Sequence, residues 1–136
     1  MTSAVSTARK NSETEEVISP STAKNLANYG ITFINSADEI ILKRGATVIT
    51  KISKSSAGLL GPAIALLDSK SAEGALVAQT RFNIERYYAK SQDLNGQIKM
   101  RQMLSRGDHI GIVLYLLSHG YQYKSLDELL NEGLSQ

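Results

Sequence analysis

The sequence contains no cysteine among its 136 residues. Without thiols, disulfide bonds, thiolate metal sites and cysteine nucleophiles are excluded. Histidine is also scarce, because His109 and His119 are the two that the sequence holds. They are too far apart to face each other across one helical turn, and no acidic cluster lies beside them. We therefore expect no metal site and no bound cofactor.

Long hydrophobic runs are absent as well. The longest apolar stretch, "AGLLGPAIALL" at residues 57–67, is well short of the ~20 residues that a membrane-spanning helix needs. The first residues lack the apolar core of a signal peptide. We therefore expect a cytoplasmic protein or a component of an assembled particle, with no transmembrane segment and with peripheral membrane contact left open.

Catalytic signatures are missing too. The sequence has no GxSxG, P-loop or GxGxxG pattern, which predicts that the protein is not an enzyme. The formal net charge of +2 is small for a nucleic-acid-binding protein. Hydrophobic residues make up 42% and charged residues 21%, as in an ordinary soluble domain with a real core.

The composition divides the chain into a tail and a body. Residues 1–18 are rich in Ser, Thr and Glu and show no hydrophobic period, so we expect a disordered, flexible N-terminal tail. Residues 19–136 are expected to form a single helical domain. The predicted fold class is all-α, a compact bundle of four to six helices with the apolar segment 110–117 at its centre.

In the first half of the body, helix start signals precede an ambiguous segment. Ser19-Pro20 predicts the start of a helix, and Ser36 followed by Glu39 is typical of a capping box. An amphipathic helix is expected from there to about Ser56. Because residues 48–52 are mostly β-branched, a strand over 46–53 is the alternative.

The second half predicts a long helix over about 72–103. Asn95-Gly96 is a turn dipeptide, so we expect a kink or break there, and Leu94 and Ile98 lie to one side of the main apolar face. Arg106-Gly107 should end this element. Further start and stop signals follow: Asp108 as a helix cap, Gly120 as a C-terminal stop, and a second capping box at Ser125–Glu128.

The segment "HGYQYKSLDELLNEGLS" resembles the second-helix region of tetracycline-repressor-like regulators, in which a Gly-aromatic turn precedes a short helix. The resemblance implies DNA binding through a recognition helix that follows this region and enters the major groove. No such helix follows in this sequence. We therefore expect a helical hairpin that packs Tyr121 or Tyr123 against the hydrophobic helix 110–117.

Two sets of side chains are candidate interaction sites. Apolar residues near a Gly-containing stretch form a candidate self-association surface, with a buried core as the other interpretation: Leu59, Leu60 and Ile64. Basic residues beside aromatics within 81–106 form a candidate basic face for a nucleic acid or an acidic partner: Arg81, Arg86, Lys90, Lys99 and Arg101.

These observations favour a non-enzymatic structural, assembly or protein-interaction protein. It would act through helical surfaces, by self-association or by docking to a larger complex such as a virion or a secretion apparatus. One alternative is a nucleic-acid-associated protein that uses the basic residues of 81–106. A second is a membrane-surface protein that uses the lysine-lined and apolar segment 37–67.

Overall fold

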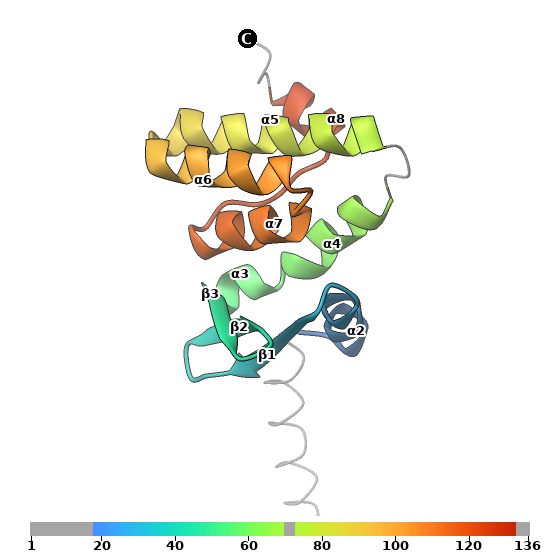
Figure 1. Cartoon of the computed structure of the whole chain (residues 1–136), viewed down its shortest axis with the longest axis vertical. Helices are drawn as coiled ribbons and strands as arrows, with labels where there is room; N and C mark the ends of the chain where they lie inside the picture. Colours follow the sequence, from blue (N-terminus) through green and yellow to red (C-terminus); the bar gives the residue numbers. More distant parts are fainter. Residues whose placement is uncertain (1–17, 70–72, 133–136) are drawn as a thin grey trace, which may run out of the picture. The chain divides into compact units, whose positions relative to one another are not determined.

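A computed structural model describes residues 18–69 and 73–132 (Figure 1). The chain divides into two compact units, with the boundary between Gly61 and Pro62. Apart from Ile18, the predicted flexible tail lies outside the described residues. Ile18 itself is 4% exposed and belongs to the core of the first unit.

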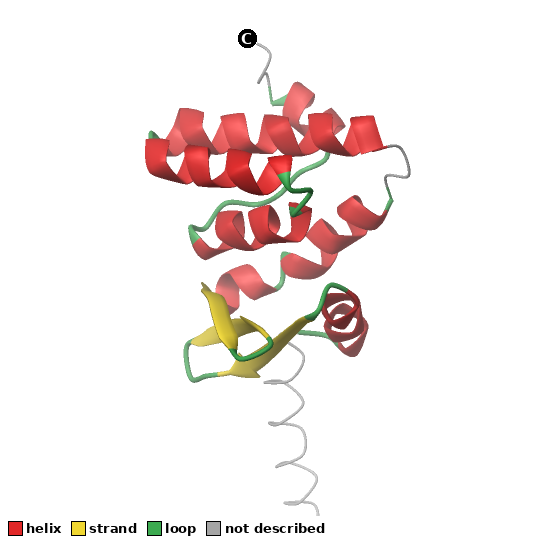
Figure 2. Cartoon of the chain, viewed as in Figure 1, coloured by secondary structure: helices red, strands yellow, loops and turns green. Residues whose placement is uncertain are grey.

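The first unit contains a three-stranded antiparallel sheet of order β1-β2-β3, so the all-α prediction is wrong (Figure 2). The strands are β1 (Ile31–Asn35), β2 (Glu39–Arg44) and β3 (Thr47–Ser53). The fold is therefore mixed, with helices and one sheet. The expected amphipathic helix after Ser36 does not exist, and the strand alternative for 46–53 is confirmed.

Turn chemistry and side-chain branching explain why strands replace the expected helix. The Ser36 backbone N–H donates to the Glu39 carbonyl at 2.9 Å, and this hydrogen bond closes the β1–β2 turn. Ser36 and Glu39, which were expected to cap a helix, therefore belong to a β-hairpin. Gly45 has φ +64° at the first position of the two-residue β2–β3 turn, which only glycine adopts without strain. The β-branched residues of β3 then favour an extended backbone over a helix.

The core of the first unit lies on one face of the sheet. Buried side chains alternate along the strands: Ile31, Ile40, Leu42 and Ile52. The helix α2 (Pro20–Asn28) contacts β1 and buries Leu26. Its Ser19 cap confirms the predicted helix start, and Gly30, at φ +76°, follows the end of the helix. A short helix, α3 (Lys54–Ala57), follows β3.

The second unit is helical. Its elements are α5 (Glu73–Ser91), α6 (Leu94–Ser105), α7 (His109–Ser118) and α8 (Leu126–Asn131), and α4 (Leu60–Asp68) contains the unit boundary. α5 contacts α6, α7 and α8. Nearly every residue of α7 is buried, which confirms the predicted central helix: Ile110, Gly111, Ile112, Val113, Leu114, Leu116 and Leu117.

The predicted interruption of the long helix exists, but it lies earlier than Asn95-Gly96. α5 ends at Ser91, because the next residue, Gln92, has a φ of +58° that terminates the helix. Asp93 caps α6 by accepting from the Gly96 N–H at 3.0 Å. Asn95 and Gly96 therefore form the first turn of α6. The break allows α5 and α6 to run antiparallel, side by side, as a helical hairpin (Figure 1).

The remaining end signals of the second unit are confirmed. Gly107 and Gly120 have φ of +74° and +81°, and each ends a helix in a Schellman arrangement. Asp108 caps α7, and Ser125 with Glu128 forms the complete capping box of α8. None of the helices among the described residues is both long and apolar enough to cross a bilayer.

Candidate interaction surface on the α5–α6 hairpin

The predicted self-association residues lie at the start of α4 and directly before it. Leu60 and Ile64 are fully buried, and Leu59 is half-buried. Leu60 and Ile64 therefore present no apolar surface, and Leu59 is the member of this set with exposed area. The burial of Leu60 and Ile64 agrees with the other interpretation of this set, that its side chains belong to a buried core.

The predicted basic residues do not share one face. Arg86 lies on the side of α5 that meets α8, where its Nε donates to Glu132 at 2.9 Å. Lys99 of α6 lies near α7, with its Nζ 5.7 Å from the ring centre of Tyr115. Lys90 is exposed near the end of α5. Three of the five predicted basic residues are thus spread over different surfaces.

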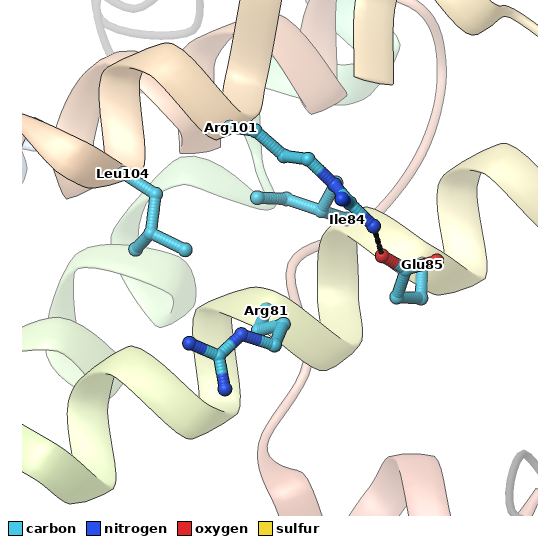
Figure 3. Close-up of a pocket in the computed structure, with 5 residues that line it drawn as sticks. All are labelled: Arg81, Ile84, Glu85, Arg101 and Leu104. Carbon is cyan, nitrogen blue, oxygen red and sulfur yellow. Dashed lines mark hydrogen bonds and ion pairs between the residues drawn. The ribbon is translucent and has the colours of Figure 1, made fainter. Parts of the chain in front are cut away.

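Arg81 and Arg101 are the two that the structure brings together. They flank a pocket of about 250 Å³ between α5 and α6. Arg101 is ion-paired with Glu85 across the hairpin, whereas Arg81 forms no ion pair with any described residue. Figure 3 shows Arg101 reaching Glu85, with the Arg81 guanidinium turned away from that pair. One side of the pocket therefore offers a cation without an internal counter-ion.

The pocket wall is apolar between these charges. Ile84, fully buried, comes from α5, and half-buried Leu104 comes from α6 (Figure 3). Helical spacing explains the arrangement, because residues three or four apart lie on one side of a helix. Arg81 and Glu85 are four apart on α5, and Arg101 and Leu104 are three apart on α6. The antiparallel hairpin sets the two pairs against each other.

An exposed apolar pair extends this surface along α6. Leu94 is 54% exposed and Ile98 is 47% exposed, and their spacing of four places them on one side of the helix. Arg101 follows three residues later on the same side. We call Leu94, Ile98 and the pocket residues together the hairpin surface. Its signal in the sequence was the displacement of Leu94 and Ile98 from the main apolar face.

Asp93 fixes the geometry of the hairpin at its closed end. Its carboxylate accepts from the Tyr87 hydroxyl at 2.6 Å and from the Tyr115 hydroxyl at 2.9 Å, in addition to the Gly96 N–H. These hydrogen bonds, led by that from Tyr87, hold the pKa of Asp93 below its usual value. One carboxylate thus joins α5, α6 and α7 at the closed end of the hairpin.

A second polar cluster, inside the unit, attaches the segment before α8 to α5. The Tyr123 hydroxyl hydrogen-bonds with Thr80 at 2.8 Å and accepts from Gln79 at 3.2 Å. The Asn83 amide both donates to the Lys124 carbonyl and accepts from the Lys124 N–H, each at 2.8 Å. The predicted hairpin of α7 and α8 is wrong, because α8 packs against α5 and the Tyr123 hydroxyl bonds to α5. The sequence analysis did not identify these residues. Their polar groups hydrogen-bond to one another, so their role is to hold the fold together.

Other chemistry has little support in the described part of the chain. No group of three His, Asp or Glu side chains lies close enough there to hold a metal ion. Every buried side-chain nitrogen and oxygen among the described residues has a hydrogen-bond partner. The hairpin surface, with its pocket, its exposed apolar pair and its unpaired cation, is the feature best suited to contact another molecule.

Comparison with known proteins gives no independent indication of function. No protein-family model, no curated protein and no solved structure matches this chain.

Proposed function

We propose that the protein is a non-enzymatic assembly and interaction protein that self-associates through the hairpin surface. The observation that carries this proposal is the exposure of Leu94 and Ile98 on α6, on the side of the helix that also bears Arg101 of the pocket. Neighbouring large apolar side chains at the surface are typical of protein contacts. Arg81 and Arg101 at the adjoining pocket would give such a contact its charge specificity.

The magnitude of the apolar contribution indicates a weak contact. Full burial of a Leu or Ile side chain contributes about 1.5–3 kcal/mol, so covering the exposed half of each contributes about 1 kcal/mol. Two such side chains alone do not offset the entropy that association costs. The pocket must therefore supply further binding free energy, and the expected assembly is reversible and dependent on concentration.

Light scattering of the purified protein tests this proposal. The molar mass would be measured over a concentration series reaching about 1 mM, where even a contact worth about 4 kcal/mol is half populated. We expect the mass to rise with concentration for the wild type and to stay monomeric for the double variant Leu94→Gln, Ile98→Gln.

The matched control is the double variant Ile34→Gln, Val48→Gln. It removes two apolar side chains of similar exposure, 48% and 50%, from the sheet of the other unit. The control should associate like the wild type. A wild type that stays monomeric throughout, or a control that loses association as fully as the α6 variant, would contradict the proposal.

A nucleic-acid-associated role is the second candidate, and the unpaired guanidinium of Arg81 is the observation in its favour. Internal ion pairs of Arg86 and Arg101 reduce the positive charge that such a role would use. Retention on DNA or RNA at low salt, weakened by charge reversal at Arg81, Arg86 and Arg101, would support it. Absence of retention at low salt would remove it.

The amphipathic helix on which the membrane-surface alternative relied is not present in the structure. This alternative relied on a lysine-lined amphipathic helix within 37–67, and the structure has strands β2 and β3 over 39–53 instead. Lys43 and Lys51 lie on the sheet face opposite the core, and Lys51 is ion-paired with Glu39 at 3.9 Å.

A further inference from the structure

We infer that the α5–α6 pocket binds the acidic segment of residues 13–17 from a second copy of this chain. The inference rests on the proposed function and deepens it, because it names the group that fills the pocket in the assembly. The pocket and the segment come from different parts of the chain, so the contact joins two unlike surfaces.

The pocket defines the chemistry of its ligand. Ile84 and Leu104 provide an apolar wall, and a volume of about 250 Å³ has room for one aliphatic side chain. Arg81 has no carboxylate partner among the described residues, and Arg101 is bound to Glu85 alone. The best ligand is therefore an aliphatic side chain preceded or followed by carboxylates, since guanidinium groups bind carboxylates in a fixed, directional geometry.

The chain carries such a sequence. Residues 12–17 read "SETEEV", in which Glu13, Glu15 and Glu16 precede Val17. No other six-residue stretch of the chain places three acidic residues directly before an aliphatic one. Ile18 follows at once and is buried in the first unit, so the segment is attached to the folded body of its own copy.

The contact predicts a particular form of assembly. Because each copy offers one pocket and one acidic segment, the copies would join head to tail. Such a contact produces a ring if the rotation between copies closes, and an open chain if it does not. The apolar pair on α6 would add area next to the pocket but would not select the partner.

A charge-swap experiment tests the inference. The variant Arg81→Glu reverses the pocket charge, and the variant Glu15→Arg, Glu16→Arg reverses the segment charge. Each alone should associate about tenfold more weakly than the wild type, because like charges then meet at the contact. An equimolar mixture of the two should recover association, since the reversed segment of one variant fits the reversed pocket of the other.

The matched control is Arg106→Glu, which makes the same charge change at an exposed residue beyond the end of α6 and outside the pocket. It should associate like the wild type. Equal loss in Arg106→Glu and Arg81→Glu, or a mixture that stays as weakly associated as its components, would overturn the inference. Circular dichroism of each variant verifies that the fold is intact.

A peptide titration separates this inference from the proposed function. A synthetic peptide of residues 11–18 is added to the isotope-labelled protein, and amide shifts are recorded by NMR. We expect saturable shifts confined to 81–85 and 101–104, absent with a peptide in which lysine replaces each glutamate. If the peptide causes no localised shift while association still requires Leu94 and Ile98, the inference fails and the proposed function stands. If the peptide binds but the Leu94→Gln, Ile98→Gln variant associates normally, the inference stands and the proposed role of Leu94 and Ile98 fails.

Discussion

Gly96 lies in the first turn of α6, and a Cβ atom at this position would overlap the Asp93 carboxylate and the Tyr115 hydroxyl. Both groups are held in place, because Asp93 also accepts from Tyr87 and caps the helix. The glycine is therefore required by close packing and not by a positive φ. The contacts between Asp93, Tyr115 and the first turn of α6 therefore depend on glycine at position 96, because alanine would add a methyl group where these side chains lie.

The substitution Gly96→Ala should lower the free energy of unfolding by about 1–3 kcal/mol, the usual cost of overpacking, despite the better helix propensity of alanine. Urea denaturation provides the measurement. Gly74→Ala is the control, because it also changes a helical glycine but has no atom within 4 Å of the added Cβ. Equal stability of the two variants would show that the Asp93 junction is not rigid.

This residue also shows a limit of sequence reasoning. Asn95-Gly96 predicted a break, and a break does occur nearby, but glycine stands there to admit a cap and a tyrosine hydroxyl from distant Tyr115. Propensity describes the local backbone alone. The tertiary contact that decides the role of Gly96 joins residues far apart in the sequence, so no local pattern reports it.

At the scale of elements, the helices of the second unit were predictable and the sheet was not. Caps and stops depend on neighbouring residues, which explains why Asp108, Gly120 and the Ser125–Glu128 box were placed correctly. Residues 46–53 fit both a helical and a strand pattern, whereas 39–44 were expected to be helical, and the two-residue turn at Gly45 joins two strands instead. The correct alternative was present in the β-branched residues of 48–52.

The candidate site was predictable in part. Arg81 and Arg101 were expected to contribute to binding, and they do flank the pocket. Their pairing depends on where α5 ends, because the position of Gln92 sets which residues of α5 and α6 face each other. The sequence places the break within a few residues, and an error of that size rotates a helix face away from its partner. Leu104 and Glu85 were therefore missed.

The attachment of α8 to α5 predicts a pH dependence. Lys124 and Arg86 lower the pKa of Glu132 to about 2. A carboxyl group with a lowered pKa in the fold stabilises it above the ordinary pKa near 4.5, and this contribution is lost as the pH falls toward 2. The stability difference between the wild type and Glu132→Gln should therefore be full at pH 7 and shrink between about pH 4.5 and 2.

Urea denaturation at a series of pH values measures this difference. Asp127→Asn, a change of the same charge at an exposed position of α8, serves as the control. It should differ little from the wild type across the series, because Asp127 has no ion pair with a described residue. A Glu132→Gln difference that stays constant down to pH 2.5 would contradict the role of the Arg86–Glu132–Lys124 cluster.

At the scale of the whole molecule, the distribution of charge governs association. The chain is nearly neutral, with a formal net charge of +2, so repulsion between copies is weak. Its acidic segment at 13–16 and its arginine-flanked pocket are separate sites of opposite charge. Attraction between copies should therefore come from these local sites and be sensitive to ionic strength.

We expect the association of the wild type to weaken as sodium chloride rises from about 0.05 to 0.5 M, because salt screens exposed charges over distances of about 10 Å or less. Light scattering at fixed protein concentration provides the measurement. The Arg81→Glu variant is the reference, since its remaining association should depend little on salt or increase with it. Association of the wild type that grows stronger with salt would indicate a mainly apolar contact centred on Leu94 and Ile98.

The two tyrosines that share the Asp93 carboxylate also give the molecule an optical signature. The chain has six tyrosines and no tryptophan, so phenol rings dominate its near-ultraviolet absorbance. Burial, reinforced by the hydrogen bond to Asp93, raises the pKa of Tyr87 and of Tyr115. Both hydroxyls therefore stay protonated in mild alkali while the fold is intact, so neither ring contributes phenolate absorbance. Burial also raises the pKa of Tyr123, which lies in the separate cluster with Thr80 and Gln79. Delayed ionisation of tyrosine in alkali therefore reports that these two buried clusters of the second unit are intact.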